Sequence, residues 1–357
     1  MSVGLKFDEV MSQPYEDPKN KAEKPVAASM SRRLKMILIG IVSAGALGGI
    51  IISYLIITAP KRPEVDKSGI TMDVDIDNKN NSGENPELLQ KKLDNPNIIT
   101  NYFQDHPPAK AEHPLDPSIH VARVGLKYGR ENIQDYTVVM HKRERIKGKL
   151  AKKEIVELKI RHDSIAEGME QSPMSVYVKF VEPKAMAGRE VVWQKGRNKD
   201  KLTVHEYSVV GHVQLNLPPN GFLAMQGNRY PLTEIGFETL VLRMIEKGVR
   251  DRKHGECEVN INRMAKINDR DCTMIEIIHP EERDHFEFHI ARVFIDDEYN
   301  IPLRYASYSW PEEKGGEPVL EEEYTFTDIK INVGLKDIDF DVVNPEYNFP
   351  TKKSLNK

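Results

Sequence analysis

An uncharged, apolar run near the N-terminus is the strongest constraint that this sequence places on its fold. Residues 36–59 contain no charged side chain across 24 positions. An α-helix of that length rises by about 36 Å, enough to cross a hydrocarbon core of about 30 Å. The alternative is a cleaved signal peptide, whose apolar region has only about 7–15 residues. The length therefore favours an uncleaved membrane anchor.

The charges that flank this run predict its orientation. Six Lys or Arg residues lie between positions 19 and 35, with Arg32, Arg33 and Lys35 directly before the run, against four between positions 61 and 79. Basic residues are enriched on the cytoplasmic side of membrane spans. We therefore expect a single-pass protein with its N-terminus in the cytoplasm and its larger, C-terminal part on the other side of the membrane.

The remaining sequence divides into tails, a tether and one folded domain. Residues 1–35 are polar without a sustained apolar period, which is typical of a disordered cytoplasmic tail. Residues 60–113 are rich in Asp, Asn and Pro and predict a tether, interrupted by a short helix around Glu87–Leu93. We expect the folded domain over residues 114–350 and a short tail over 351–357. The net charge of −4 gives no sign of a nucleic-acid-binding protein.

Alternating apolar and polar residues predict strands through most of the domain. In SVYVKFV, Val176, Val178 and Phe180 share one face of a strand, and the intervening side chains take the other. Such runs recur at short intervals between turns, which is typical of a large antiparallel sheet. We expect strands at 136–146, 154–162, 175–181, 190–194, 202–207, 213–217, 258–266, 272–279, 285–295, 303–309 and 322–332.

Two segments have helical periodicity instead. Residues 118–130 predict a short helix, and a clearer one follows Pro231, with Thr233 as the expected N-cap and Gly248 as the expected end. An apolar stripe on one side of this second helix must bury against a sheet face. The predicted fold is mainly β (α+β), a curled antiparallel sheet or incomplete β-barrel that wraps one or two helices. The stripe consists of Phe237, Leu240, Val241, Met244 and Ile245.

Few motifs in the sequence carry chemistry. It has no GxSxG, Gly-rich phosphate loop, HExxH or CxxC. His285, Glu287 and His289 would share one strand face, but steps of about 6.6 Å are too wide for a compact metal site. Cys257 and Cys272 lie too far apart in the predicted hairpin for a disulfide, so we expect two free, partly buried thiols. We therefore expect no cofactor, no metal site and no catalytic activity.

Two C-terminal strings resemble a bacterial protein family. The string FIDDEYNIPLRYASYSW contains Asp296, Pro302, Leu303 and Arg304. The following string, EEYTFTDIKINVGLKDIDFDVVNPEY, contains Tyr324, Phe326, Leu335, Asp337 and Phe340. Together they are similar to the uncharacterised domain of unknown function 1571, and more distantly to the periplasmic lipoprotein-carrier superfamily of LolA, LolB and the RseB sensor domain. The resemblance extends over residues 115–350.

The resemblance implies a curled, incomplete antiparallel barrel with helices across its mouth and an apolar cavity. It also implies a bacterial inner-membrane protein whose C-terminal domain lies in the periplasm. Carriers of this superfamily are soluble or lipid-anchored, whereas residues 36–59 would hold this chain at its own membrane. We therefore expect it to receive, hold or sense a ligand there.

The leading functional hypothesis is a binding module for a hydrophobic ligand, namely an acyl chain, a lipid or a lipoprotein. One alternative is an envelope sensor or scaffold that binds another protein through the same domain. Another is that the helix after Pro231 fills the interior and leaves only a packed core. Strand parity assigns the expected ligand-binding residues to the concave face: Val176, Val178, Phe180, Val213, Leu215, Leu217, Tyr324 and Phe326.

Overall fold

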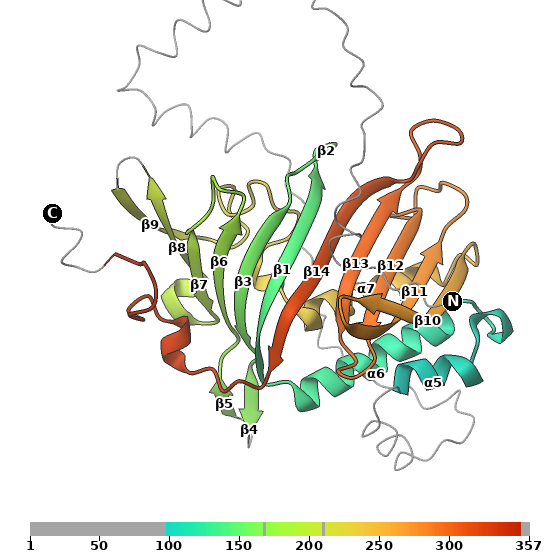
Figure 1. The fold of residues 1–357 in the computed structure, drawn as a ribbon, viewed down its shortest axis with the longest axis horizontal. Helices are drawn as coiled ribbons and strands as arrows, with labels where there is room; N and C mark the ends of the chain where they lie inside the picture. Colours follow the sequence, from blue (N-terminus) through green and yellow to red (C-terminus); the bar gives the residue numbers. More distant parts are fainter. Residues whose placement is uncertain (1–97, 167–168, 209–210, 351–357) are drawn as a thin grey trace, which may run out of the picture. The chain divides into compact units, whose positions relative to one another are not determined.

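An open, curved antiparallel sheet makes up most of the described structure (Figure 1). The computed structural model describes residues 98–166, 169–208 and 211–350. The main sheet has the strand order β10-β11-β12-β13-β14-β1-β3-β6-β7-β8-β9, so β10 and β9 form its two edges and it does not close into a barrel. In addition, β2 pairs with β1, and β4 and β5 form a separate hairpin.

The strands follow the alternating runs of the sequence. The first half of the domain contains β1 (Asp135–Ile146), β2 (Lys149–Leu150), β3 (Glu154–Arg161), β4 (Ser164–Ala166), β5 (Met169–Ser172), β6 (Ser175–Glu182), β7 (Glu190–Gln194), β8 (Leu202–Ser208) and β9 (Gly211–Leu217). The second half contains β10 (Glu258–Ile267), β11 (Arg270–Ile278), β12 (Ile290–Asp296), β13 (Pro302–Ser309) and β14 (Val319–Ile331). The prediction of a curled antiparallel sheet is therefore confirmed.

One face of the sheet carries a continuous apolar surface. Val138, Leu158, Val178 and Val191 lie opposite one another on four neighbouring strands, β1, β3, β6 and β7. Each of them is at most 5% exposed. Because side chains of a strand alternate between faces, this register aligns the apolar positions of all four strands on the same side. We call this side the inner face.

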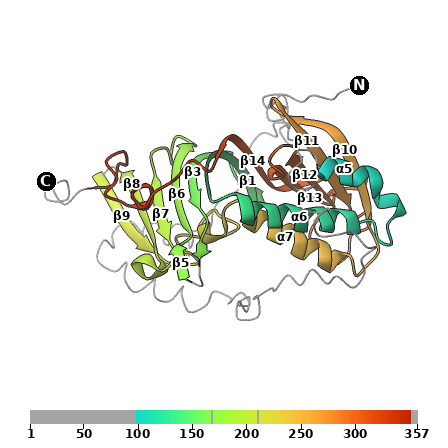
Figure 2. The ribbon, with the colours of Figure 1, turned by 90° about the horizontal axis from the view of Figure 1, so that it is seen from below.

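The helices α5 (Ile98–Asp105), α6 (Asp116–Asn132) and α7 (Phe237–Asp251) lie along the inner face of the sheet (Figure 2). The predicted stripe of α7 is buried there: Phe237 and Val241 are at most 8% exposed, and Leu240 packs against both large apolar clusters. In the part of the chain that the structure describes, no helix is both long and apolar enough to span a membrane. The expected anchor at residues 36–59 and the short helix expected around Glu87–Leu93 lie outside that part.

Both predicted ends of α7 were wrong. The helix begins after Gly236, and Thr233 lies in a separate 3-10 turn (Leu232–Glu234). The cap is long-range, because the backbone N–H of Phe237 donates to the hydroxyl oxygen of Tyr136 at 3.1 Å. Gly248 does not end the helix either. It lets α6 approach, since a Cβ atom there would lie 3.1 Å from Cγ1 of Ile119.

Two other predicted segments differ from the structure. Residues 98–105, which the sequence assigned to the tether, form α5, because Ile99 and Phe103 bury against β11–β13. Residues 285–289 precede β12 instead of extending it. The alternation of HFEFH arises because Phe286 and Phe288 pack around the buried ring of His279, with centroid distances of 3.8 and 4.7 Å.

The opposite, outer face of β6 and β7 is covered by the C-terminal segment, residues 335–350 (Figure 2). Phe340 and Phe349 are at most 5% exposed and pack with Tyr177 and Val192. The segment is held by Glu190, whose carboxylate accepts hydrogen bonds from the Tyr177 hydroxyl and the Asn348 backbone N–H, both at 2.8 Å. The strands β6 and β7 are therefore covered on both faces.

The cap of α7 predicts the effect of three substitutions on stability. Tyr136→Phe leaves the buried N–H of Phe237 without an acceptor and should lower the free energy of unfolding by about 1–3 kcal/mol. Gly236→Ala should cost more, because its Cβ would lie 2.6 Å from the Tyr136 hydroxyl oxygen at a φ of 112°. Gly148→Ala, with a φ of 77° and open space around it, should show only the backbone strain of about 1–2 kcal/mol.

These differences can be measured by chemical denaturation of the full chain. Equal losses for Gly236→Ala and Gly148→Ala, or an unchanged midpoint for Tyr136→Phe, would show that this contact does not position the helix.

Candidate ligand-binding cavity

A cavity of about 580 Å³ lies between the inner face and the segment that joins β9 to α7. We call that segment, residues 218–236, the cover. The first turns of α7 complete the boundary of the cavity on that side, with Leu240 among the lining residues. The apolar part of the sheet wall is formed by Met140, Val156, Phe180, Val191, Leu202, Val204, Leu215, Leu217 and Phe326.

The wall changes from apolar to charged along the strands. On β1, the inner-face positions that line the cavity are Met140, then Lys142, then Glu144. On β3, Val156 is followed in the same direction by Glu154. On β8, Val204 is followed by Glu206, which lies at the same end because the intervening strands alternate in direction. The cavity therefore has an apolar part and a charged end.

The charged end is held together by ion pairs. Lys142 lies 3.4 Å from Glu154 and 3.7 Å from Glu144, and its ammonium group donates to the Asn228 side chain of the cover at 2.6 Å. Arg189, which precedes β7, pairs with Glu206 at 2.9 Å.

The third pair joins the cover to α7. It is formed by Glu234 of the cover and Arg243 of the helix. The guanidinium of Arg243 also lies 3.4 Å from the centre of the Tyr230 ring. These contacts link strands, cover and helix around the same end of the cavity.

The opening of the cavity lies beside the edge strand β9. Leu215 of β9 and Leu223 of the cover both line the cavity, and they are 45% and 57% exposed. Phe222, next to Leu223, is 79% exposed. Exposed apolar side chains of β9 and of the cover therefore lie next to each other at this edge of the sheet.

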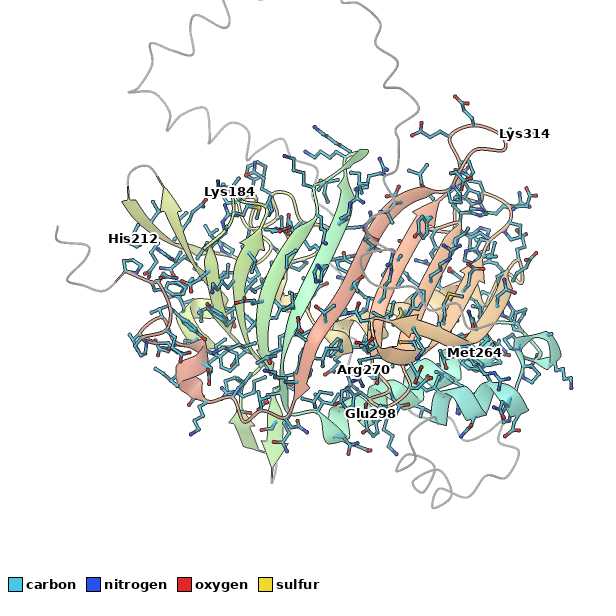
Figure 3. All side chains as sticks on the ribbon, in the orientation of Figure 1. Lys184, His212, Met264, Arg270, Glu298 and Lys314 are labelled. Atoms are coloured by element: carbon cyan, nitrogen blue, oxygen red, sulfur yellow. The ribbon has the colours of Figure 1, made fainter. Side chains whose placement is uncertain are left out.

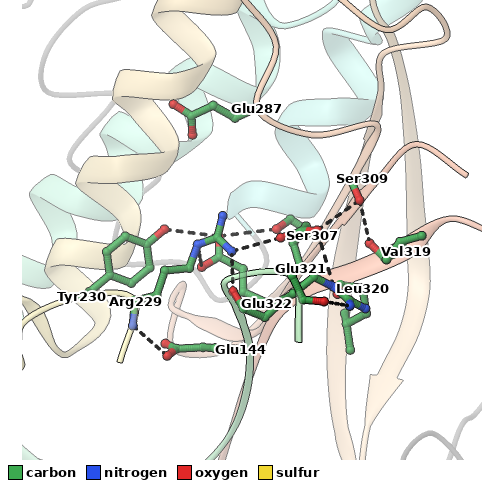
Figure 4. A network of polar contacts seen from close by, with 12 residues as sticks. Glu144, Arg229, Tyr230, Glu287, Ser307, Ser309, Val319, Leu320, Glu321 and Glu322 are labelled. Atoms are coloured by element: carbon green, nitrogen blue, oxygen red, sulfur yellow. Dashed lines mark hydrogen bonds and ion pairs between the residues drawn. The ribbon is translucent and has the colours of Figure 1, made fainter. Parts of the chain in front are cut away.

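A buried polar network fixes the cover to the sheet (Figure 4). Glu144 of β1 and Glu322 of β14 are partners in the ladder and only 3% and 1% exposed. Two like charges placed opposite each other repel strongly away from water. The cover supplies the compensation: Arg229 lies 3.5 Å from Glu322, and its backbone N–H donates to Glu144 at 2.9 Å. Lys247 of α7 lies 3.7 Å from Glu322.

Two tyrosines complete this network as hydrogen-bond donors. The Tyr324 hydroxyl has one proton to donate and lies within hydrogen-bond distance of both carboxylates, at 2.6 Å from Glu144 and 3.2 Å from Glu322. The Tyr230 hydroxyl donates to Glu322 at 3.3 Å. Burial, followed by the charge of Glu322, raises the pKa of Tyr230 to about 12. Burial and the charges of Glu322 and Glu144 raise the pKa of Tyr324 well above its usual range. Both hydroxyls therefore stay protonated and keep donating to the carboxylates.

The structure brings five of the eight expected ligand-binding residues to the cavity wall. They are Phe180, Leu215, Leu217, Tyr324 and Phe326. Val176 and Val178 are on the inner face as expected, but they are at most 1% exposed and belong to the packed core beside the cavity. Val213 lies on β9 and does not line it.

The alternation of strand residues did not predict that the cover lines the cavity. The connection from β9 to α7 runs over residues 218–236 and contains only the 3-10 turn at Leu232–Glu234. Connections of this length are uncommon inside a domain and often carry function. Its apolar residues within a Gly- and Pro-containing loop were the signal that could have identified it: Leu223, Ala224, Tyr230, Leu232 and Ile235 all line the cavity.

The first of the two C-terminal strings that suggested a family, residues 294–310, stabilises the fold. Asp296 is fully buried, pairs with Arg270 and accepts the backbone N–H groups of Glu298 and Tyr299 at 3.0 and 2.7 Å. Arg270 also pairs with Glu298 at 2.8 Å, at the turn between β12 and β13 (Figure 3). Arg304 pairs across the ladder with Glu323 at 3.0 Å. None of the residues named here lines the cavity.

The structure also describes both cysteines and the three residues that the sequence analysis considered as metal ligands, His285, Glu287 and His289. Cys257 and Cys272 are free thiols, as expected, and Cys272 is fully buried. Among the described residues, no group of three or more His, Cys, Asp or Glu side chains is arranged to hold a metal ion.

Comparison with solved structures gives distant neighbours. One is a DUF1329 family protein from Desulfovibrio piger, 12% identical, with a TM-score of 0.31, covering 64% of this chain and 98% of that one. A putative outer membrane lipoprotein-sorting protein domain from Vibrio parahaemolyticus is 14% identical, with a TM-score of 0.29 and coverages of 62% and 95%. A LolA superfamily protein from Nitrosomonas europaea is 13% identical, with a TM-score of 0.23 and coverages of 62% and 97%.

Sequence comparison gives a firmer result. No curated protein matches the chain. A family profile described as protein of unknown function (DUF1571) matches residues 133–349, which is more than half of the sequence and includes every strand of the main sheet. The chain therefore belongs to the DUF1571 family.

Proposed function

We propose that this protein binds a hydrophobic ligand, with an acyl chain held in the cavity beneath the cover, and that it does so without catalysis. The observation that carries the proposal is the cavity itself. Its volume of about 580 Å³ lies within the range of roughly 300–1,000 Å³ that is usual for ligand pockets. Its wall is apolar except at one end, which is the distribution that an amphiphile with one apolar chain requires.

The energetics of chain burial support this proposal. Each buried methylene contributes about 0.8 kcal/mol, so ten of them contribute about 8 kcal/mol. Association costs at least about 4 kcal/mol in lost translational and rotational freedom. A chain of ten or more methylenes would therefore bind with useful affinity, provided that the cavity exists before the ligand arrives. The ion pairs and the Glu144–Glu322 network hold the cover in place and supply that preorganisation.

We further propose that residues 36–59 anchor the chain in the bacterial inner membrane, with the described domain on the periplasmic side. The support is the length of the uncharged run and the basic residues before it. An anchored binding domain would exchange its ligand at the membrane that holds it. A lipid or lipoprotein of that membrane is the natural source of an acyl chain.

Photolabelling of the full chain tests ligand binding. A diazirine-substituted dodecane, which has no head group, should label peptides of β3, β6, β8 and β9 after irradiation, as mapped by mass spectrometry. Phe180→Trp should reduce this labelling about tenfold, because the larger ring occupies the cavity, and should leave the melting temperature nearly unchanged.

The control is Met264→Trp, which adds the same ring at a 62% exposed position of β10 that does not line the cavity. Its labelling should equal that of the wild type. If Phe180 instead lies in a filled core, Phe180→Trp should lower stability by about 1–3 kcal/mol and the wild type should not be labelled at these strands.

The role of the cover can be tested at Arg229. Arg229→Met leaves Glu144 and Glu322 undercompensated and should lower the free energy of unfolding by about 1–3 kcal/mol, less than a fully buried pair because the guanidinium is partly exposed. Limited proteolysis should then cut at Phe222 or Leu223 faster than in the wild type. Arg283→Met, which breaks an exposed pair with Glu256, should change stability by less than about 1 kcal/mol. Equal effects of the two substitutions would contradict the anchoring role of Arg229.

Reporter fusions test the topology. Alkaline phosphatase, which folds only outside the cytoplasm, should be active when fused after Lys357 in a bacterial host. A reporter that works only in the cytoplasm should be inactive at the same position, and activity of that reporter would refute the proposed orientation.

A further inference from the structure

We infer that the cavity selects a single-chain amphiphile whose head group is uncharged and bears both a hydrogen-bond donor and an acceptor, such as a hydroxyl or amide, and that it disfavours a free fatty acid. This inference rests on the proposed function and specifies its ligand class. Three features of the cavity lead to it: its capacity, the pairing of its charges, and two buried polar atoms at its charged end.

The capacity of the cavity fits one chain. A methylene-sized group occupies roughly 30 Å³, similar to the share of a water molecule in the liquid. One chain of sixteen carbons then needs roughly 480 Å³, whereas two need roughly 960 Å³. The volume of about 580 Å³ is enough for one such chain and smaller than two require.

The charges that line the cavity leave no cation for an anionic head. The lining cations Lys142, Arg189 and Arg243 are each paired with a carboxylate that also lines the cavity. Four carboxylates line it in all, namely Glu144, Glu154, Glu206 and Glu234. Because each lining cation is already paired, a carboxylate head would have to break an existing pair to gain a cation.

Two buried atoms at the charged end indicate what a head group must supply. Oε2 of Glu154 accepts no hydrogen bond within the described residues, although the ammonium of Lys142 lies 3.4 Å away. Nε of Arg189 likewise donates no hydrogen bond there, and its guanidinium lies over the ring of Phe180. Buried polar atoms are normally satisfied, so these two call for a donor and an acceptor from the ligand.

The position of these atoms fits a head group at the end of a chain. Glu154 lies two residues before Val156 on β3, towards the charged end of the cavity, and Arg189 lies beside Phe180. Both atoms therefore lie where the apolar wall ends. A hydroxyl or amide head group offers both a donor and an acceptor, the two kinds of group that these atoms lack. A carboxylate cannot donate, and a quaternary ammonium can neither donate nor accept.

Competition against photolabelling tests the inference on the full chain. The head-free diazirine dodecane is bound first, and 1-monolauroylglycerol or laurate is then added at pH 8, where laurate is ionised. The two competitors have the same chain. We expect monolauroylglycerol to halve the labelling of the cavity peptides at a concentration at least tenfold below that of laurate.

A variant with fewer lining carboxylates tests the cause. Glu154→Gln combined with Glu206→Gln removes two of the four carboxylates and leaves Arg189 without its partner and Lys142 with Glu144 alone. The difference between the competitors should then fall below about threefold. The matched control is Glu157→Gln, on the outer face of the same strand, where Glu157 is exposed and pairs with Lys179. It should keep the full difference.

The outcomes separate this inference from the proposed function. If the dodecane labels the cavity but laurate competes as well as monolauroylglycerol, or neither competes, the head-group inference is wrong and the binding of an apolar chain stands. If the dodecane does not label the cavity of the wild type at all, both are wrong.

Discussion

The pairing of Glu144 with Glu322 is the constraint on which the cavity depends. Two carboxylates lie opposite each other on neighbouring strands and are almost completely buried, which is unfavourable unless cations and donors surround them. Part of their compensation comes from the sheet itself, through Lys142 and Tyr324. The rest comes from residues far away in the sequence, Arg229 and Tyr230 of the cover and Lys247 of α7. The burial of these carboxylates is therefore fully compensated only when the cover and the helix are in place. The contacts that compensate these charges also hold the cover and α7 over the cavity.

A second long-range contact fixes the point at which the cover ends and α7 begins. The hydroxyl of Tyr136 accepts the first N–H of α7, and the adjacent Gly236 has the positive φ and the absence of a side chain that this close approach requires. Tyr136 is fully buried on β1, the same strand that carries Met140, Lys142 and Glu144 along the cavity. One strand thus fixes the start of the helix at one end and the cover at the other. The space between these two attachments remains unfilled.

Sequence predicted the sheet well because alternation is a local property. The position of a residue in a strand determines which face its side chain takes. The alternating runs therefore located eleven strands of the main sheet, and parity alone identified five cavity residues. The two-residue strand β2 was missed because it is too short to alternate. The predicted strand at 285–295 began too early, because Phe286 and Phe288 alternate around His279 in a segment that precedes β12. The cap of α7 and the role of Gly248 depend on Tyr136 and Ile119, over 100 residues away, so no local pattern could reveal them.

The covering of β7 on both faces has a mechanical consequence. Val191 and Trp193 point inward, whereas Glu190 and Val192 are clamped beneath the C-terminal segment, so this part of the wall has no free side on which to yield. On the far side, β9 has a strand neighbour on one edge only, and its Leu215 is half exposed. Under the proposed function, a ligand longer or bulkier than the cavity would be accommodated by bending of β8 and β9 away from the cover. Tolerance for chain length would then be set by the stiffness of a single hairpin.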